Sequence, residues 1–143
     1  MSDAEAAAVL DRALQAGVDF VMTCLKRMRG GEIFVPRIPS VRITDLATAM
    51  APDLPQKIVG IRPGEKLHEI MCPQDDSHLT LEFDDHFVIT PSIRFHRAEI
   101  SYEVNGLGER GTPVAQGTEY HSGTNPHFLS VEEIREHNRS AQV

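Results

Sequence analysis

Apolar residues recur at steps of three and four positions along the first part of the chain. This spacing places them on one face of a helix and predicts a long helix over residues 4–28. The members of that face are Leu10, Leu14, Val18, Val21, Leu25 and Met28. Gly30 and Gly31 follow directly, and we expect them to end the helix.

Short apolar runs bounded by turn residues predict four strands. Pro36 and Pro39 end the first run, and Asp84 with Asp85 joins the last two. The predicted strands cover residues 32–35, 57–61, 80–83 and 86–90.

Two shorter helices are expected between these strands. Thr44 is the expected N-cap of a helix over residues 45–50, which Pro52 closes. Residues 66–71 are expected to form the other helix. Strands that alternate with helices in this way indicate an α/β fold class.

The pattern changes after Pro91. Residues 91–129 hold most of the later glycines and show no long apolar period. We therefore expect residues 1–90 to form the α/β portion, and residues 91–143 to form a loop-rich arm that packs on something else or is partly mobile. Ser130 and Glu133 have the spacing of a capping box, which predicts a short terminal helix.

Composition narrows the class of protein. The 143 residues correspond to one domain, and their net charge of -7 argues against a general nucleic-acid binder. Cys24 and Cys72 are too few for a disulfide framework and indicate a reducing, cytoplasmic setting. No apolar run approaches the ~20 residues of a membrane span, and the acidic start is unlike a signal peptide.

The segment from Gly60 to Glu69 carries the most specific candidate chemistry. Arg62 can hold a phosphate through two parallel hydrogen bonds, and Gly64 lets the backbone approach a ligand closely. Glu65 can accept hydrogen bonds from vicinal hydroxyls. These groups together suit a nucleoside diphosphate. An ordinary strand-to-helix turn with a surface ion pair explains the same residues, and the spacing alone does not choose between the two.

Other motifs give no catalytic, cofactor or metal residues. Residues 106–111 match the dinucleotide fingerprint formally, but no helical pattern follows, so we expect a turn-rich loop. His68 and Glu69 lack the second histidine of a zinc-protease motif, and the other histidines are not clustered. Neither Tyr102 nor Tyr120 has a lysine four residues later, as short-chain dehydrogenases require.

Several of these segments, in order, resemble one enzyme family. They are residues 30–40, 43–47, 60–69 and 80–85, with further similarity in residues 119–122 and 129–133. Over about residues 15–138 the chain resembles the C-terminal part of the inverting UDP-N-acetylglucosamine 4,6-dehydratases. These are extended short-chain dehydrogenase/reductase enzymes that begin the synthesis of pseudaminic acid and related bacterial surface sugars.

The resemblance implies roles for particular residues. Arg62 would bind the UDP pyrophosphate and Glu65 would accept from the ribose hydroxyls, while Lys66 and His68 belong to the motif without an assigned contact. Residues 1–90 would then be the UDP-sugar-binding portion. The full-length family oxidises C4 with NADP and removes water across C5–C6.

The family's first half, a Rossmann domain with the NADP loop and the Tyr-x-x-x-Lys pair, has no counterpart in this sequence. Residues 1–14 also diverge from the family, which suggests that Met1 starts within a truncated or misassigned frame. We therefore expect no turnover by this chain alone, and exposed sheet edges and apolar faces where a Rossmann half or another copy would pack. Two alternatives stay open: a non-catalytic UDP-sugar-binding module, and an oligomerisation module without a ligand.

Overall fold

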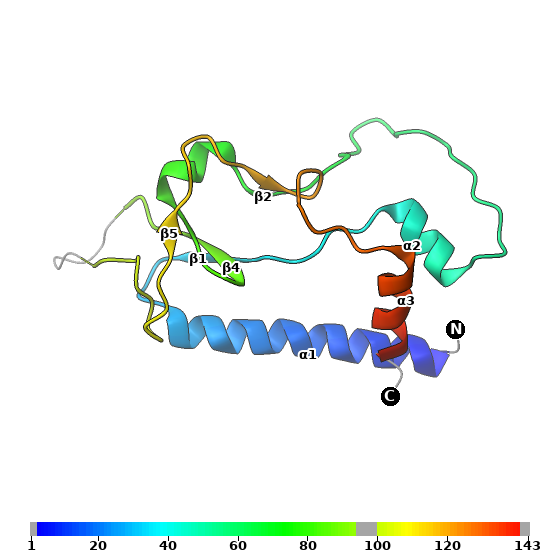
Figure 1. The fold of residues 1–143 in the computed structure, drawn as a ribbon, viewed down its shortest axis with the longest axis horizontal. Helices are drawn as coiled ribbons and strands as arrows, with labels where there is room; N and C mark the ends of the chain where they lie inside the picture. The colour runs from blue at the N-terminus through cyan, green and yellow to red at the C-terminus, as the bar shows by residue number, and fades with distance from the viewer. Residues whose placement is uncertain (1–2, 94–99, 141–143) are drawn as a thin grey trace.

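The computed structural model describes residues 3–93 and 100–140, with the side chains of residues 14–93 and 100–139. The chain begins with the 25-residue helix α1, Asp3–Arg27, which confirms the predicted long helix. Figure 1 shows α1 running beneath a small sheet, with the two further helices on the side of the view where α1 begins. The helix and strand mixture confirms the expected α/β class, although the pairing within both sheets is antiparallel.

The main sheet has four strands in the order β1-β4-β3-β5. They are β1 (Ile33–Pro36), β4 (His86–Ile89), β3 (Thr80–Glu82) and β5 (Thr112–Pro113). The predicted hairpin is confirmed, because β3 and β4 pair with Leu81 opposite Val88. Proline has no amide hydrogen to donate to a neighbouring strand. Pro36 is tolerated in β1 because this strand lies at the edge of the sheet.

Apolar side chains on the two faces of this sheet form two small cores. Successive residues of a strand point to opposite faces, so alternate positions enter different clusters. One cluster consists of the buried residues Val35, Cys72, Phe87 and Ile89. The other consists of Leu81, Phe83 and Val88, against which Phe34 and Tyr102 pack. The sheet is therefore a central layer with apolar packing on both sides.

The arm after residue 91 pairs with the first part of the chain. β5 adds to the main sheet beside β3, and β6 (Tyr120–His121) pairs with β2 (Ile70–Cys72) in a second, two-stranded sheet. The last helix, α3 (Val131–Ser140), packs against α2 (Ile43–Met50). The capping box is confirmed, since the Ser130 amide donates to Glu133 at 2.7 Å and the Glu133 amide donates to Ser130 Oγ at 3.2 Å. The division at residue 90 stays a prediction.

Three local predictions were wrong. α2 begins two residues earlier than predicted, so that Arg42 is its N-cap and Thr44 lies in the first turn, where its carbonyl accepts from Thr48. Residues 57–61 form no strand in the part of the chain that the structure describes, because no strand there pairs with them. Residues 66–71 form no helix; pairing with β6 draws Ile70–Cys72 into a strand, preceded by an irregular stretch, and a 3-10 helix, η1 (Gln74–Leu79), follows.

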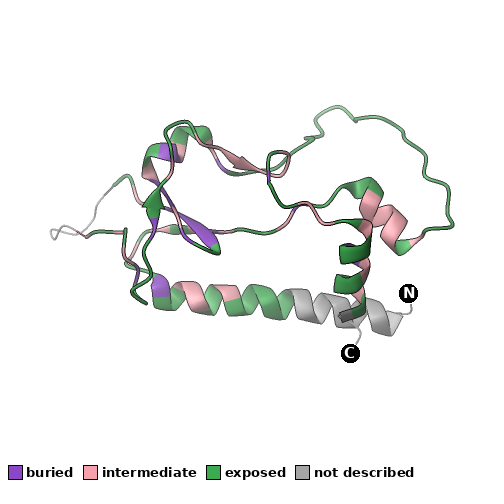
Figure 2. Ribbon diagram, viewed as in Figure 1, coloured by how far each residue is buried: buried purple, intermediate pink, exposed green. Residues whose placement is uncertain are grey.

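Much apolar surface is exposed among the described residues, as the sequence led us to expect. Figure 2 shows burial concentrated in the sheet, while most of the described part of α1 is exposed. Along that helix Leu14 is 61% exposed and Leu25 is 57% exposed; Leu10 lies outside the described side chains. Among the described residues, no helix has the length and apolar character needed to cross a membrane.

Candidate functional site

The segment predicted to bind a diphosphate forms a preorganised turn. The amide of Arg62 donates to Glu65 Oε2 at 2.8 Å, and the amide of Glu65 donates back to the Arg62 carbonyl at 3.1 Å. Gly64 has a φ of 83° and no atom near the place where a Cβ would stand. This left-handed conformation is the reason that a glycine suits the position. The structure thus brings Arg62 and Glu65 together.

This turn lies on an exposed loop. Figure 1 shows the chain between α2 and β2 arcing away from the rest of the fold. Residues 52–71 are all exposed, including Lys66, and the described part of the chain provides no partner for the Arg62 guanidinium. His68 lies closer to the fold, with its ring 5.7 Å from that of His121. The guanidinium is therefore free to meet a ligand.

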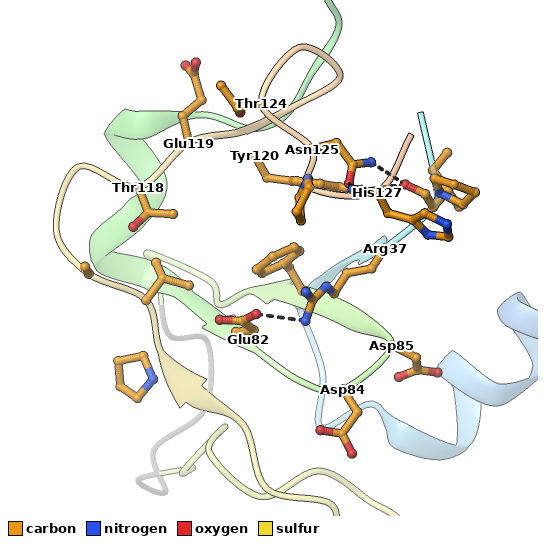
Figure 3. Close-up of a pocket in the computed structure, with 17 residues that line it drawn as sticks. Arg37, Glu82, Asp84, Asp85, Thr118, Glu119, Tyr120, Thr124, Asn125 and His127 are labelled. Carbon is orange, nitrogen blue, oxygen red and sulfur yellow. Dashed lines mark hydrogen bonds and ion pairs between the residues drawn. The ribbon is translucent and has the colours of Figure 1, made fainter. Parts of the chain in front are cut away.

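A cavity of about 790 Å³ lies elsewhere, between the β3–β4 hairpin and the arm. Figure 3 shows Arg37 at its centre, where the guanidinium contacts Glu82 at 2.8 Å. On the arm side, Asn125 donates to the Ile38 carbonyl at 2.7 Å. Neither Arg62 nor Glu65 lines this cavity. Arg37 and Asn125 are thus already occupied by groups of the chain that line the same cavity.

A charged network fixes the end of α1 to the sheet and the arm. The buried Arg27 contacts Asp85 at 3.1 Å and Glu109 at 2.7 Å. His86 is fully buried, and its Nδ1 lies 2.6 Å from Asp85 Oδ1. An ionised carboxylate can only accept, so Nδ1 carries the proton.

The same contacts shift the pKa values of both carboxyl groups. Burial acts to raise the pKa of Asp85, but hydrogen bonds from His86 and Arg27 outweigh it and leave that pKa below its ordinary value. Hydrogen bonds from Arg27 and then Asn105 lower the pKa of Glu109. Both groups are therefore held ionised, as partners of Arg27.

The glycine-rich segment 106–111 has a structural role. The Gly106 amide donates to the Arg27 carbonyl at 2.7 Å, and Val104 bridges Arg110 across the turn. β5 follows it in place of a helix, which confirms the expected turn-rich loop. In the dinucleotide fingerprint the pyrophosphate lies at the N-terminus of the helix that follows, so this segment lacks the structural context of an NADP site. No group of three or more metal-ligating side chains occurs among the described residues.

A solved structure supports the fold. The X-ray structure of Pen from Bacillus thuringiensis superposes with a TM-score of 0.58 at 24% sequence identity, over 84% of this chain and 35% of that one. This likeness concerns the fold alone, and it agrees with the α/β class.

Sequence comparisons define the family. The pattern of the family described as "Polysaccharide biosynthesis protein" matches residues 12–91, and the chain belongs to that family. It is 52% identical over 124 residues to the inverting UDP-N-acetylglucosamine 4,6-dehydratase of Campylobacter jejuni serotype O:2. A second such dehydratase, from C. jejuni serotype O:23/36, is 52% identical over 122 residues. These matches cover 87% and 85% of this chain, but 37% and 36% of the relatives, so the chain spans about a third of their length.

The sequence singled out the segment with Arg62 and Glu65 but did not indicate the residues that hold the arm in place. Arg27 falls in the last turn of the predicted helix, where cations are favourable, and nothing local connects it with Glu109, 82 positions away. Asn125 is likewise 87 positions from Ile38, whose carbonyl it binds. Only information on residue pairs distant in sequence could have indicated such contacts.

Proposed function

We propose that this chain is the substrate-side portion of a UDP-N-acetylglucosamine 4,6-dehydratase and that it holds the UDP group of the sugar nucleotide. The identity of 52% with two enzymes of that name carries the proposal. In the complete enzyme the reaction is an NADP-dependent oxidation at C4 with loss of water across C5–C6, in the synthesis of pseudaminic acid or a related surface sugar. The two free cysteines, Cys24 and Cys72, favour a reducing, cytoplasmic setting.

The turn at Arg62 supplies the binding chemistry. The free guanidinium of Arg62 can grip the pyrophosphate with two parallel hydrogen bonds, which lysine could not match geometrically. Glu65 closes the turn with Oε2, which leaves Oε1 to accept from the ribose hydroxyls. Gripping the remote UDP orients the sugar, and such positioning can lower a reaction barrier by several kcal/mol.

The chemical step needs groups that lie outside this chain. Residues 106–111 do not fit NADP, and no Tyr-x-x-x-Lys pair is present in the sequence. We expect the purified chain to bind UDP-N-acetylglucosamine without converting it. Measurable conversion with added NADP would refute this part of the proposal.

Calorimetric titration with UDP and with UDP-N-acetylglucosamine tests the binding role. Both ligands should bind the intact chain, and Arg62→Ala should weaken both. Arg110→Ala is the matched control, because Arg110 is also an exposed arginine and lies beside a turn, where it bridges Val104. No heat of binding with the intact chain, or equal losses in the two variants, would contradict the proposal.

The exposed face of α1 favours a second role in association. Leu14, Val21 and Leu25 are 61%, 56% and 57% exposed, which is unusual for apolar side chains that recur on one helix face. Such a face suits a Rossmann half or a second copy of the chain. Sedimentation would separate this oligomerisation role from UDP binding, because assembly through α1 should not respond to UDP.

A further inference from the structure

The loop that carries Arg62 is held only at its ends. Among the described residues, no hydrogen bond or ion pair joins residues 57–67 to another segment; the bonds within this stretch are those of the turn from Arg62 to Glu65. Its apolar residues do not anchor it either, since Ile58 is 78% exposed and Leu67 is 72% exposed. The position of the turn therefore depends on the two attachment points.

The first attachment is to α2. The Gln56 side-chain amide donates to Thr48 Oγ1 at 2.8 Å and to the Thr44 carbonyl at 3.2 Å. These groups are exposed, so this contact competes with water and constrains the loop weakly.

The second attachment is to the arm. The Glu69 amide donates to Ser122 Oγ at 3.0 Å, and the Ser122 amide donates back to the Glu69 carbonyl at 2.9 Å. The β2–β6 pairing continues from this point, with Ile70 opposite His121. This end is therefore tied to a strand pair as well as to a side chain.

The side chain of His68 reinforces the same end. Its ring lies 5.7 Å from the ring of His121 and covers the backbone of Gly123. A Cβ added at Gly123 would stand 2.7 Å from the His68 ring, closer than real contacts allow. Gly123 thus makes room for a histidine that belongs to the diphosphate motif itself.

We infer that Ser122 and Gly123 are positioning residues for the UDP site. Through their contacts with Glu69 and His68 they set the position of the Arg62 turn relative to the rest of the fold. This inference rests on the proposed UDP binding. It assigns a role to the arm, which lies outside the matched family region of residues 12–91. The arm touches no ligand in this account and acts only through the loop.

Two measurements on the full chain test the inference. The first is the affinity of each variant for UDP, measured by calorimetry. Ser122→Ala removes the acceptor and should weaken UDP binding about five-fold, since one hydrogen bond contributes about 1 kcal/mol. Ser122→Thr keeps the hydroxyl and should restore binding to within about two-fold. Gly123→Ala should displace His68 and weaken binding at least as much as Ser122→Ala. Ser101→Ala, at an exposed serine, is the control.

The second measurement is hydrogen exchange at the Glu69 amide without ligand, which should speed up in Ser122→Ala and recover in Ser122→Thr. Thermal unfolding of each variant is recorded alongside, because a merely structural role would lower stability and leave the UDP affinity of the folded chain intact. Intact UDP affinity in both Ser122→Ala and Gly123→Ala would overturn the inference and leave the proposed function standing. Absence of UDP binding by the unaltered chain would overturn both.

Discussion

Arg27 holds the carboxylate of Glu109 through two parallel hydrogen bonds, with Nε 2.7 Å from Oε2 and a terminal nitrogen 3.0 Å from Oε1. The arginine ends α1, whereas the glutamate belongs to the arm. The remaining terminal nitrogen of Arg27 donates to Asp85, in the β3–β4 turn. One buried guanidinium thus joins helix, sheet and arm.

Loss of this guanidinium should destabilise the fold. Arg27→Ala leaves two carboxylates without their cation, and because both are partly exposed we expect a cost of about 1–3 kcal/mol, below that of a fully buried pair. Arg139→Ala removes an exposed ion pair with Glu136 and should cost less than about 0.5 kcal/mol. Urea unfolding compares the two; similar costs would contradict the central place given to Arg27.

Acid should weaken the same network. The pKa values of Asp85 and Glu109 lie below their ordinary values, so their contribution to stability is complete above the ordinary carboxyl range of about 4 and is lost as pH falls through the lowered values. Arg27→Ala should therefore show a flatter loss of stability between neutral and acid pH than the unaltered chain. Parallel pH profiles of the free energy of unfolding would count against this linkage.

Two glycines should respond in opposite directions to replacement by alanine. A Cβ at Gly106 would stand 2.4 Å from the Lys26 carbonyl, so Gly106→Ala should force the arm away from α1 and destabilise by about 1–3 kcal/mol. Gly17 lies inside α1 with nothing within 4 Å of an added Cβ, and Gly17→Ala should stabilise by about 0.5–1 kcal/mol. Thermal unfolding measures the change in stability of both variants. A Gly106→Ala variant with unchanged stability would show that the arm is not packed as described.

The two cysteines should differ in reactivity. Burial, and next the charge of Asp76, raise the pKa of the Cys72 thiol to about 11, and its side chain lies in the core. Cys24 is only half-buried, although burial raises its pKa too. Since the thiolate is the nucleophile, iodoacetamide at pH 8 should modify Cys24 at least about ten-fold faster than Cys72. Peptide mass spectrometry gives both rates, which should converge in urea; equal rates in the native chain would disagree with the burial of Cys72.

The sequence predicted elements whose determinants are local. The long helix follows from its apolar spacing, the β3–β4 hairpin from two adjacent apolar runs around Asp84 and Asp85, and the start of α3 from Ser130 and Glu133. In each case the residues that decide the structure lie within a few positions of one another. Local chemistry was sufficient there.

Elements that depend on distant partners were not predictable. β5 and β6 have two residues each and form only because β3 and β2 present open edges to them. The apolar run 57–61 is not a strand, because no strand among the described residues pairs with it. At the candidate site Arg62, Gly64 and Glu65 were singled out from the sequence by their chemistry, but the attachment of this segment through Ser122 depends on a contact across 53 positions.

Glu65 should contribute to recognition of the ribose. If its free carboxylate oxygen accepts from a hydroxyl, UDP should bind the intact chain more tightly than 2′-deoxy-UDP, by about 10–100-fold for one hydrogen bond to a charged group. In Glu65→Ala this preference should disappear. Glu65→Gln can still close the turn, and it should keep UDP binding while reducing the preference. A Glu65→Ala variant that retains the full preference would place the ribose elsewhere.

The ratio of UDP to uridine affinity is the most direct test of diphosphate binding at Arg62, because only UDP offers phosphates to this side chain. Calorimetry on the intact chain and on Arg110→Ala should show UDP binding about 10–100-fold more tightly than uridine, as expected for a bidentate charged contact. In Arg62→Ala the ratio should fall close to one while uridine binding is retained. An Arg62→Ala chain that keeps the ratio of the unaltered protein would contradict the assignment of the diphosphate to this turn.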